Sequence, residues 1–329
     1  SGTPGDFITA IAAQTVSGTF TGTLGAGDKI QVSANGTTWV DATAGAGTWS
    51  AAGVTLSPGT GTLSVRTIDA ATNPTAGVGH AYTLDTGAPP AIATVTALSA
   101  DTGTPGDFVT NVASQTVSGT FTGTLGAGEK IQVSVDGTTW IDAVAGAGTW
   151  SAAGVILLAG SGTLSVRTID ASSNATAGVG HAYTLDALAP AAPAIGSVGG
   201  ADGTVSSQPG DATVTGTAEA GSTITVKNGA TTLGTTTTDG GGAWTYTLTP
   251  TDLTTIGQGS GKTVSATATD TAGNSSASSS SAAFTIDTVV PPAIATVTAI
   301  SSDTGTPGDF VTSVAAQTVS GTFIGALGA

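Results

Sequence analysis

The chain repeats itself every 101 residues, and this period limits what it can fold into. Residues 1–85 and 102–186 align without a gap and are identical at 68 of 85 positions. Two sets of aspartates keep the same spacing: Asp85, Asp186 and Asp287, and Asp101, Asp202 and Asp303. A fixed period of this size indicates one small domain repeated in series, not one large fold.

The period also sets the predicted domain boundaries. We expect a first repeat over residues 1–85 that lacks its first strand, a second over 86–186, a divergent third over 187–287, and the truncated start of a fourth over 288–329. The segment PPAIATVTALSAD, which begins the second repeat at Pro89, has no counterpart in the first. The partial fourth repeat, with two predicted strands, is too small to be stable alone. We therefore expect it to be disordered, paired with another chain, or continued by further residues of a longer protein.

The composition is typical of short strands joined by tight turns. Glycine supplies 50 of the 329 residues, and only 8% of residues are charged. No stretch has apolar residues at helical spacing, and no apolar run is long enough to span a bilayer, so no membrane insertion is expected. A net charge of −15 argues against nucleic acid or anionic lipid as a partner and favours cation binding. The chain has no cysteine, so neither disulfides nor thiolate metal sites are available to it.

The pattern of apolar residues predicts the strands. In the second repeat seven strands are expected, over residues 92–99, 115–123, 130–135, 138–143, 148–157, 162–170 and 179–186. Asp136-Gly137, like Asn35-Gly36 in the first repeat, predicts a two-residue type I′ hairpin. The five tryptophans are expected to fill the space between the sheets: Trp39, Trp49, Trp140, Trp150 and Trp244. The predicted fold is all-β, a linear array of tandem immunoglobulin-like β-sandwich domains with seven strands each.

Motifs in the third repeat carry a resemblance to a known family. They are GTAEAGSTITV (216–226), GAWTYTL (242–248) and ATDTAGN (268–274), followed by IDT and a Pro-Pro pair. Less literal counterparts in the other repeats are TIDAATN (67–73) and TIDASSN (168–174). Together these segments resemble the bacterial Ig-like repeats of giant surface adhesins and biofilm-associated proteins. The resemblance implies a rod of sandwiches at the bacterial cell surface or outside the cell, with structural Ca²⁺ at the domain junctions.

Ten residues are the candidate metal ligands that this resemblance implies. By junction they are Asp85, Asp170 and Asn174 at the first; Asp101, Asp186, Asp270 and Asn274 at the second; Asp202 and Asp287 at the third; and Asp303 at one beyond the chain. Carboxylates and an amide oxygen, completed by backbone carbonyls and water, suit a hard cation with six to eight oxygen ligands. The alternative is that an aspartate in a turn only caps its own backbone, and Asp107 and Asp309 in the PGDF turns fit that alternative better.

No catalytic motif is present, and no enzymatic activity is expected. His80 and His181, the two histidines, lie at equivalent positions and are predicted to be half-buried strand residues. Three functions remain. The first is a stalk or spacer of a large adhesin, whose partners are the neighbouring repeats of the same chain. The second is a self-assembling subunit of an extracellular filament, sheath or biofilm matrix, which contacts other copies of itself. The third is a glycan-binding module, for which Trp39 and Trp140 are the candidate aromatic platforms.

Overall fold

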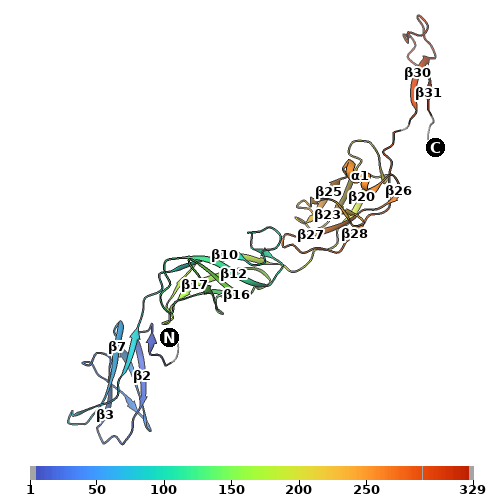
Figure 1. Cartoon of the computed structure of the whole chain (residues 1–329). Helices are drawn as coiled ribbons and strands as arrows, with labels where there is room; N and C mark the ends of the chain where they lie inside the picture. The colour runs from blue at the N-terminus through green and yellow to red at the C-terminus, as the bar shows by residue number, and fades with distance from the viewer. Residues whose placement is uncertain (1–4, 291, 326–329) are drawn as a thin grey trace. The chain divides into compact units, whose positions relative to one another are not determined.

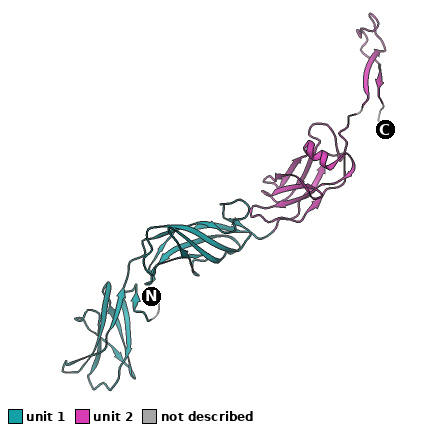
Figure 2. Ribbon diagram, in the orientation of Figure 1, with its two compact units in different colours: residues 1–188 teal, residues 189–329 magenta. Residues whose placement is uncertain are grey.

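The computed structural model describes residues 5–290 and 292–325, which divide into two compact units, residues 1–188 and 189–329 (Figures 1 and 2). Both units are built from β-strands, and the described residues contain a single short helix. The predicted all-β class, with tandem immunoglobulin-like sandwiches, is confirmed. The division into two units does not test the four domain boundaries expected from the sequence, which stay a prediction.

The first repeat has two sheets. Its strands are β1 (Ile8–Thr9), β2 (Ala13–Thr19), β3 (Lys29–Ser33), β4 (Val40–Asp41), β5 (Thr43–Ala44), β6 (Thr48–Thr55), β7 (Gly59–Ile68), β8 (Pro74–Ala76) and β9 (His80–Leu84). One sheet has the order β1-β9-β7-β3-β4, with β8 paired to β7, and the other has the order β2-β6-β5. The β1–β9 pairing is parallel, and the other pairings are antiparallel.

The second repeat has the same strands and one more. They are β10 (Ile92–Leu98), β11 (Val109–Thr110), β12 (Ser114–Thr122), β13 (Lys130–Ser134), β14 (Ile141–Asp142), β15 (Val144–Ala145), β16 (Thr149–Ile156), β17 (Gly160–Ile169), β18 (Ala175–Ala177) and β19 (His181–Leu185). The sheets have the orders β10-β12-β16-β15 and β11-β19-β17-β13-β14, with β18 paired to β17. The added strand β10 lies at the edge of the first sheet, beside β12.

The second unit holds the third repeat and the partial fourth. Its strands are β20 (Ala194–Val198), β21 (Thr204–Val205), β22 (Thr213–Thr217), β23 (Thr223–Asn228), β24 (Thr231–Thr237), β25 (Ala243–Thr247), β26 (Gly259–Lys262), β27 (Ser265–Thr269), β28 (Ser279–Ser280), β29 (Phe284–Ile286), β30 (Ile294–Ile300) and β31 (Val319–Ile324). The sheets have the orders β20-β22-β25, β21-β29-β26 and β24-β23-β27-β28, and β30 pairs with β31 alone. The helix α1 (Pro250–Ile256) follows β25.

Alternating residues of the facing sheets form one hydrophobic core in each of the three repeats. In the second repeat Ile131 and Val133 of β13 are fully buried, with Gln132 between them on the other face. The core tryptophans of the three repeats are Trp49, Trp150 and Trp244. The indole nitrogen of Trp150 donates to the backbone oxygen of Thr120 at 3.1 Å, so its polar atom is satisfied inside the core.

The expected position of two tryptophans was wrong. Trp39 and Trp140 are half-buried and belong to neither core cluster. Each lies under an arginine instead, because the guanidinium carbons of Arg66 and Arg167 are 3.9 Å from the respective ring centroids. The positive charge over the ring face stabilises the tryptophan on the outer side of the sheet.

Two other local expectations also differ from the structure. Asp136-Gly137 is not a two-residue hairpin, since Gln132 pairs with Asp142 and leaves a longer loop between β13 and β14. Gly137 has a φ of +72°, but Asp136 does not have the positive φ that a type I′ turn requires. His181 is exposed rather than half-buried, although its ring stacks on that of Phe108 with centroids 3.6 Å apart. His80 is likewise exposed and stacks on Phe7.

Candidate metal-binding ends of the repeats

A five-residue loop places Asp170 and Asn174 together where β17 ends. The backbone nitrogen of Asp170 donates to the oxygen of Asn174 at 3.1 Å, and that of Ser173 donates to the oxygen of Asp170 at 3.2 Å. The carboxylate of Asp170 accepts from the backbone nitrogen and the side-chain Nδ2 of Asn174, both at 2.8 Å. Ser173 has a φ of +71°, which closes the loop tightly enough for these contacts.

The same loop recurs in the other two repeats. Asn73 donates to Asp69 through its backbone nitrogen at 2.8 Å and through Nδ2 at 2.9 Å. Asn274 makes both contacts with Asp270 at 2.9 Å. The side-chain hydrogen bond from Asn73, with a second from its backbone nitrogen, lowers the pKa of Asp69. The sequence had indicated the loops of the second and third repeats as ligand-bearing, and the loop of the first has the same geometry.

Polar side chains of the second repeat hold the segment that leads into it from the first. Asn174 Nδ2 donates to the backbone oxygen of Asp85 at 2.8 Å. The hydroxyl of Thr176 donates to the oxygen of Pro89 at 2.5 Å, and that of Thr168 to the oxygen of Ala91 at 2.7 Å. The structure thus brings Asp85, Asp170 and Asn174 together, although Asp85 contributes its backbone oxygen. Its carboxylate accepts from the backbone nitrogen of Gly87 at 3.0 Å.

Asp101 and Asp186 lie at the opposite end of the second repeat, on either side of Thr110. The backbone nitrogen of Asp186 donates to the oxygen of Thr110 at 2.9 Å, and the Thr110 hydroxyl donates to the oxygen of Ala100 at 2.6 Å. Asp101 Oδ2 accepts from the backbone nitrogen of Gly106 at 2.6 Å. Its Oδ1 is buried and makes no hydrogen bond within the described residues.

The remaining candidates belong to the second unit. Asp202 Oδ1 accepts from the nitrogen of Thr204 at 3.0 Å, and the nitrogen of Asp287 donates to the oxygen of Val205 at 2.9 Å, so β21 connects these two aspartates. Asp303 repeats the geometry of Asp101, with one oxygen accepting from Gly308 at 2.7 Å and the other buried without a partner among the described residues.

Within residues 5–290 and 292–325, no group of three or more His, Cys, Asp or Glu side chains is close enough together to hold a metal ion. A cation at the ends of the repeats would therefore depend on backbone carbonyls and on the Asn amide as well as on carboxylates. Such mixed oxygen sets are usual for Ca²⁺. Whether the ten candidate residues bind a metal stays a prediction.

Asp107 and Asp309 cap their own turns, as the sequence indicated. Asp107 Oδ1 accepts from the nitrogen of Val109 at 2.8 Å, and Asp309 Oδ1 from that of Val311 at 2.9 Å. Each contact spans two residues, which is the geometry of an Asx turn.

A charged network surrounds the outer tryptophans. Asp142 accepts from Lys130 and from Gln132, both at 2.7 Å, and these contacts lower its pKa. Gln132 Oε1 in turn accepts from Arg167, which covers one face of Trp140. Lys29, Gln31, Asp41, Arg66 and Trp39 repeat the arrangement in the first repeat. A sugar ring stacking on that face of either tryptophan would have to displace the arginine.

In the part of the chain that the structure describes, no helix combines the length and the apolar character needed to cross a membrane.

Comparison with known proteins gives one family match. Residues 189–285 match the family model described as a bacterial Ig domain. No curated protein sequence matches the chain at a significant level.

Solved structures resemble the chain more loosely. One comes from work on host cell surface retention of a 1.5-MDa bacterial ice-binding adhesin, with 23% identity, 87% of this chain and 95% of the other covered, and a TM-score of 0.31. Another is the BSP domain of a biofilm-associated protein, with 18% identity over 72% of this chain and 44% of the other, and a TM-score of 0.22. With TM-scores this low, neither likeness carries an argument about function.

Proposed function

We propose that the chain is a structural spacer in a bacterial cell-surface or secreted adhesin, and the match of residues 189–285 to the model of a bacterial Ig domain supports this proposal. The observation that carries the proposal is the hydrogen bonding of the segment 85–91 to the second repeat. A spacer must hold its ends apart, so the joints between its domains need to be fixed as well as the domains themselves.

The contacts at this joint suit that requirement. Asn174, Thr176 and Thr168 all belong to the second repeat, and each donates to a different backbone oxygen of the incoming segment. A hydrogen bond of this kind contributes about 1 kcal/mol. Three of them spread over seven residues restrict the direction in which the segment enters, although no side chain of the first repeat's core takes part.

Calcium at the same joint is the second part of the proposal. Asn174 Nδ2 lies between two acceptors, a carboxylate oxygen of Asp170 and the backbone oxygen of Asp85. If the Asn174 side-chain amide is rotated by 180° about its Cβ–Cγ bond, its oxygen takes the place of Nδ2. The amide oxygen of Asn174, the carboxylate oxygen of Asp170 and the backbone oxygen of Asp85 then all face the same point. Ca²⁺ accepts such carboxylate, amide and carbonyl ligands, with water completing its shell. Asp85, Asp170 and Asn174 are the residues that would hold it.

The joint can be tested by distance measurements between the two repeats. We expect spin labels on cysteines introduced at the exposed, equivalent positions Thr37 and Thr138 to give a narrow distance distribution, and the chain has no cysteine of its own to interfere. Asn174→Ala should broaden the distribution, because it removes the contact to Asp85. An unchanged distribution in Asn174→Ala would contradict the fixed joint.

Calcium is tested separately by titration of the same labelled protein. Addition of Ca²⁺ should narrow the distance distribution and raise the melting temperature, and chelator should reverse both. Asp170→Asn should abolish the response. The matched control is Asp69→Asn, which alters the equivalent loop of the first repeat and should leave the response at the joint intact. A distance distribution that is narrow but does not change with Ca²⁺ or chelator would contradict the calcium site and would leave the spacer proposal supported.

A further inference from the structure

The basic side chains of this chain are concentrated on one face of one sheet. Four of the six Lys and Arg residues lie at equivalent places in the first two repeats, and these are Lys29, Arg66, Lys130 and Arg167. In the second repeat β13 pairs with β14 on one side and with β17 on the other. This register places Asp142, Gln132 and Arg167 in one row across the three strands. Together with Lys130 and Trp140, they form what we call the arginine patch.

Hydrogen bonds hold the guanidinium of this patch in place. Nε and Nη2 of Arg167 donate to Gln132 Oε1 at 2.9 and 2.7 Å, while the guanidinium carbon lies 3.9 Å from the ring centroid of Trp140. Gln132 is itself fixed, because its Nε2 donates to Asp142 at 2.7 Å. A flexible side chain is thus ordered before any ligand arrives. The arginine patch of the first repeat has corresponding contacts and consists of Lys29, Gln31, Trp39, Asp41 and Arg66.

The guanidinium groups have no carboxylate partner among the described residues. The ion pairs there are Lys29–Asp41 and Lys130–Asp142, both at 2.7 Å. Each patch therefore pairs its lysine and leaves its arginine charge unpaired. Burial lowers the pKa of Arg167, so this guanidinium has lost part of its water without gaining an opposite charge. Its N–H donors exceed the two that Gln132 accepts, which leaves donors for a ligand.

The third repeat folds without an arginine patch. In β23 Thr225 pairs with Thr235 on one side and with Thr267 on the other, so these threonines replace the row of Gln132, Asp142 and Arg167. The third repeat nevertheless closes its own hydrophobic core. The sandwich therefore does not require the patch, and a role other than folding is indicated.

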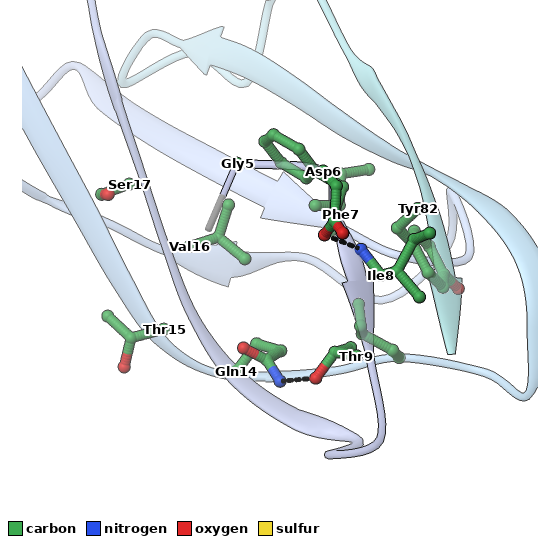
Figure 3. A pocket seen from close by; sticks show the side chains of 12 residues that line it. Gly5, Asp6, Phe7, Ile8, Thr9, Gln14, Thr15, Val16, Ser17 and Tyr82 are labelled. Carbon is green, nitrogen blue, oxygen red and sulfur yellow. Dashed lines mark hydrogen bonds between the residues drawn. The ribbon is translucent and has the colours of Figure 1, made fainter. Parts of the chain in front are cut away.

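The first repeat also contains a concave pocket of about 290 Å³, drawn in Figure 3. Its polar side chains are occupied within the chain, since Gln14 Nε2 donates to Thr9 Oγ1 at 3.2 Å and Asp6 Oδ1 accepts from the nitrogen of Ile8 at 2.9 Å. No basic side chain lines this pocket among the described residues. It lacks the unpaired charge that distinguishes the arginine patch.

The chemistry of the patch indicates the class of its ligand. An ordered guanidinium without an ionic partner binds a carboxylate through parallel hydrogen bonds. The indole of Trp140, half-buried and covered on one face by Arg167, leaves part of its ring for the C–H groups of a sugar. Lys130 and Asp142 are exposed beside it and can bond hydroxyls. We propose that the arginine patches of the first and second repeats bind an acidic polysaccharide through its carboxylates.

Two patches in one chain suit a polymeric ligand. A polysaccharide with repeated carboxylates can occupy both patches, and binding at one raises the effective concentration at the other. The net charge of −15 does not exclude such a ligand, because the four basic residues of the patches set the local charge. The inference does not depend on the spacer proposal, since each patch lies within one repeat and would survive a flexible joint.

The two patches differ by one neighbouring charge. Asp136 lies in the loop before Trp140, and its Oδ1 accepts from the backbone nitrogens of Thr139 at 2.7 Å and Thr138 at 2.8 Å. These bonds lower the pKa of Asp136, so its carboxylate is ionised at neutral pH. Asn35 occupies the same place in the first repeat and accepts the equivalent bonds without a charge. We therefore expect the first patch to bind a carboxylate more tightly than the second.

Titration of the full chain with tetragalacturonate, followed by the indole N–H signals in NMR spectra, tests the ligand. The signals of Trp39 and Trp140 should shift until saturation, and that of Trp244 in the third repeat should not. The methyl ester of the same saccharide keeps the sugar rings without the charge and should bind at least about tenfold more weakly. Equal binding of the ester or of a tetra-aspartate peptide, or no shift of either tryptophan, would overturn the proposal.

A gain of affinity tests the position of the site. Asp136→Asn should strengthen binding at Trp140 about two- to fivefold, because it removes a charge and keeps the loop bonds that Asn35 makes in the first repeat. A loss of structure cannot produce this gain. Unchanged affinity at Trp140 in this variant would contradict binding at the arginine patch.

The arginines themselves are tested together. The double variant Arg66→Ala/Arg167→Ala should weaken binding of tetragalacturonate at least about tenfold. The matched control is Lys227→Ala/Lys262→Ala, which removes the same charge from the third repeat and should change the affinity less than about twofold. Equal losses in the two double variants would show that only the net charge matters, and the proposed site would be wrong.

Discussion

At the scale of single residues, glycine determines where strand β10 can lie. An added Cβ at Gly178 would meet the backbone oxygen of Ala93 in β10 and Val166 Cγ1 at 2.7 Å. At the equivalent Gly77 it would meet Val65 Cγ1 of β7, also at 2.7 Å, and the oxygen of Val65 at 3.3 Å, but no atom of a strand in the place of β10. The two positions therefore differ in the presence of β10.

We expect Gly178→Ala to destabilise the second repeat by about 1–3 kcal/mol more than Gly77→Ala destabilises the first, because only Gly178→Ala forces a strand to move. Urea unfolding followed by hydrogen exchange of β16 and β6 measures the two repeats separately. Equal losses of stability in the two repeats would show that β10 does not limit the space available at position 178.

The sequence predicted the positions and contacts of single residues least well. Asp107 and Asp309 could be recognised as turn caps, because an Asx turn depends on residues two positions apart. The position of Trp140 depends on Arg167, which is 27 residues away and reaches it across the sheet. No local pattern contains that contact, and hydrophobicity alone favours the core for any tryptophan.

At the scale of elements, the helix α1 was not expected, because seven residues are too few to show a helical period. Its capping signal is nevertheless present in the sequence. Thr249 precedes Pro250, and Asp252 at the third helical position accepts from the nitrogen and the hydroxyl of Thr249, both at 2.8 Å. Strands were predicted more accurately because several alternating residues define each one. The second repeat has ten strands instead of the predicted seven, because the short β11, β15 and β18 have too few residues to show the alternation.

Asp252→Ala should destabilise the third repeat by about 2 kcal/mol, because it removes the Asp252 half of the capping box and the acceptor of the Tyr246 hydroxyl. Hydrogen exchange of the amides of β25, which belongs to the third repeat, measures the loss. Thr251→Ala is the control, since Thr251 lies exposed in the same helical turn and its replacement should change stability by less than about 0.5 kcal/mol. Equal effects of the two variants would contradict the importance of the cap.

The same contact predicts a dependence on alkaline pH. Burial, with the hydrogen bond to Asp252 and the charge of Asp252, raises the pKa of Tyr246 to about 12 from its ordinary value of 10.0. The folded protein therefore keeps a proton that the unfolded chain loses, so stability is complete below pH 10 and falls as the pH rises toward 12. Absorbance titration should show Tyr246 ionising above pH 10, and Asp252→Asn should shift its titration toward lower pH. If the titration of Tyr246 is the same in Asp252→Asn, the carboxylate of Asp252 is not a cause of the raised pKa.

At the scale of the whole molecule, the 101-residue period allowed the sequence to predict the array of sandwiches, because each repeat closes its own hydrophobic core. The same alignment also indicated that the first repeat lacks a strand. It did not show the hollow of about 660 Å³ along β2, since this hollow is lined by side chains from β2, β6 and β7 that only the fold brings together.

This difference predicts unequal stability in two nearly identical repeats. The strands β6 and β16 have the sequences TWSAAGVT and TWSAAGVI, so hydrogen exchange compares almost the same segment in two settings. In the second repeat β10 buries Val95 and Leu98, and each such side chain contributes about 1.5–3 kcal/mol. The amides of β6 should therefore exchange at least tenfold faster than those of β16, since a factor of ten needs only about 1.4 kcal/mol.

Equal protection of β6 and β16 would contradict this prediction, because it would mean that the side chains of β10 add no measurable stability to the sheet beside β16. Val95→Ala provides a further check, since it removes a core side chain of β10 and should speed exchange in β16 while β6 stays unchanged.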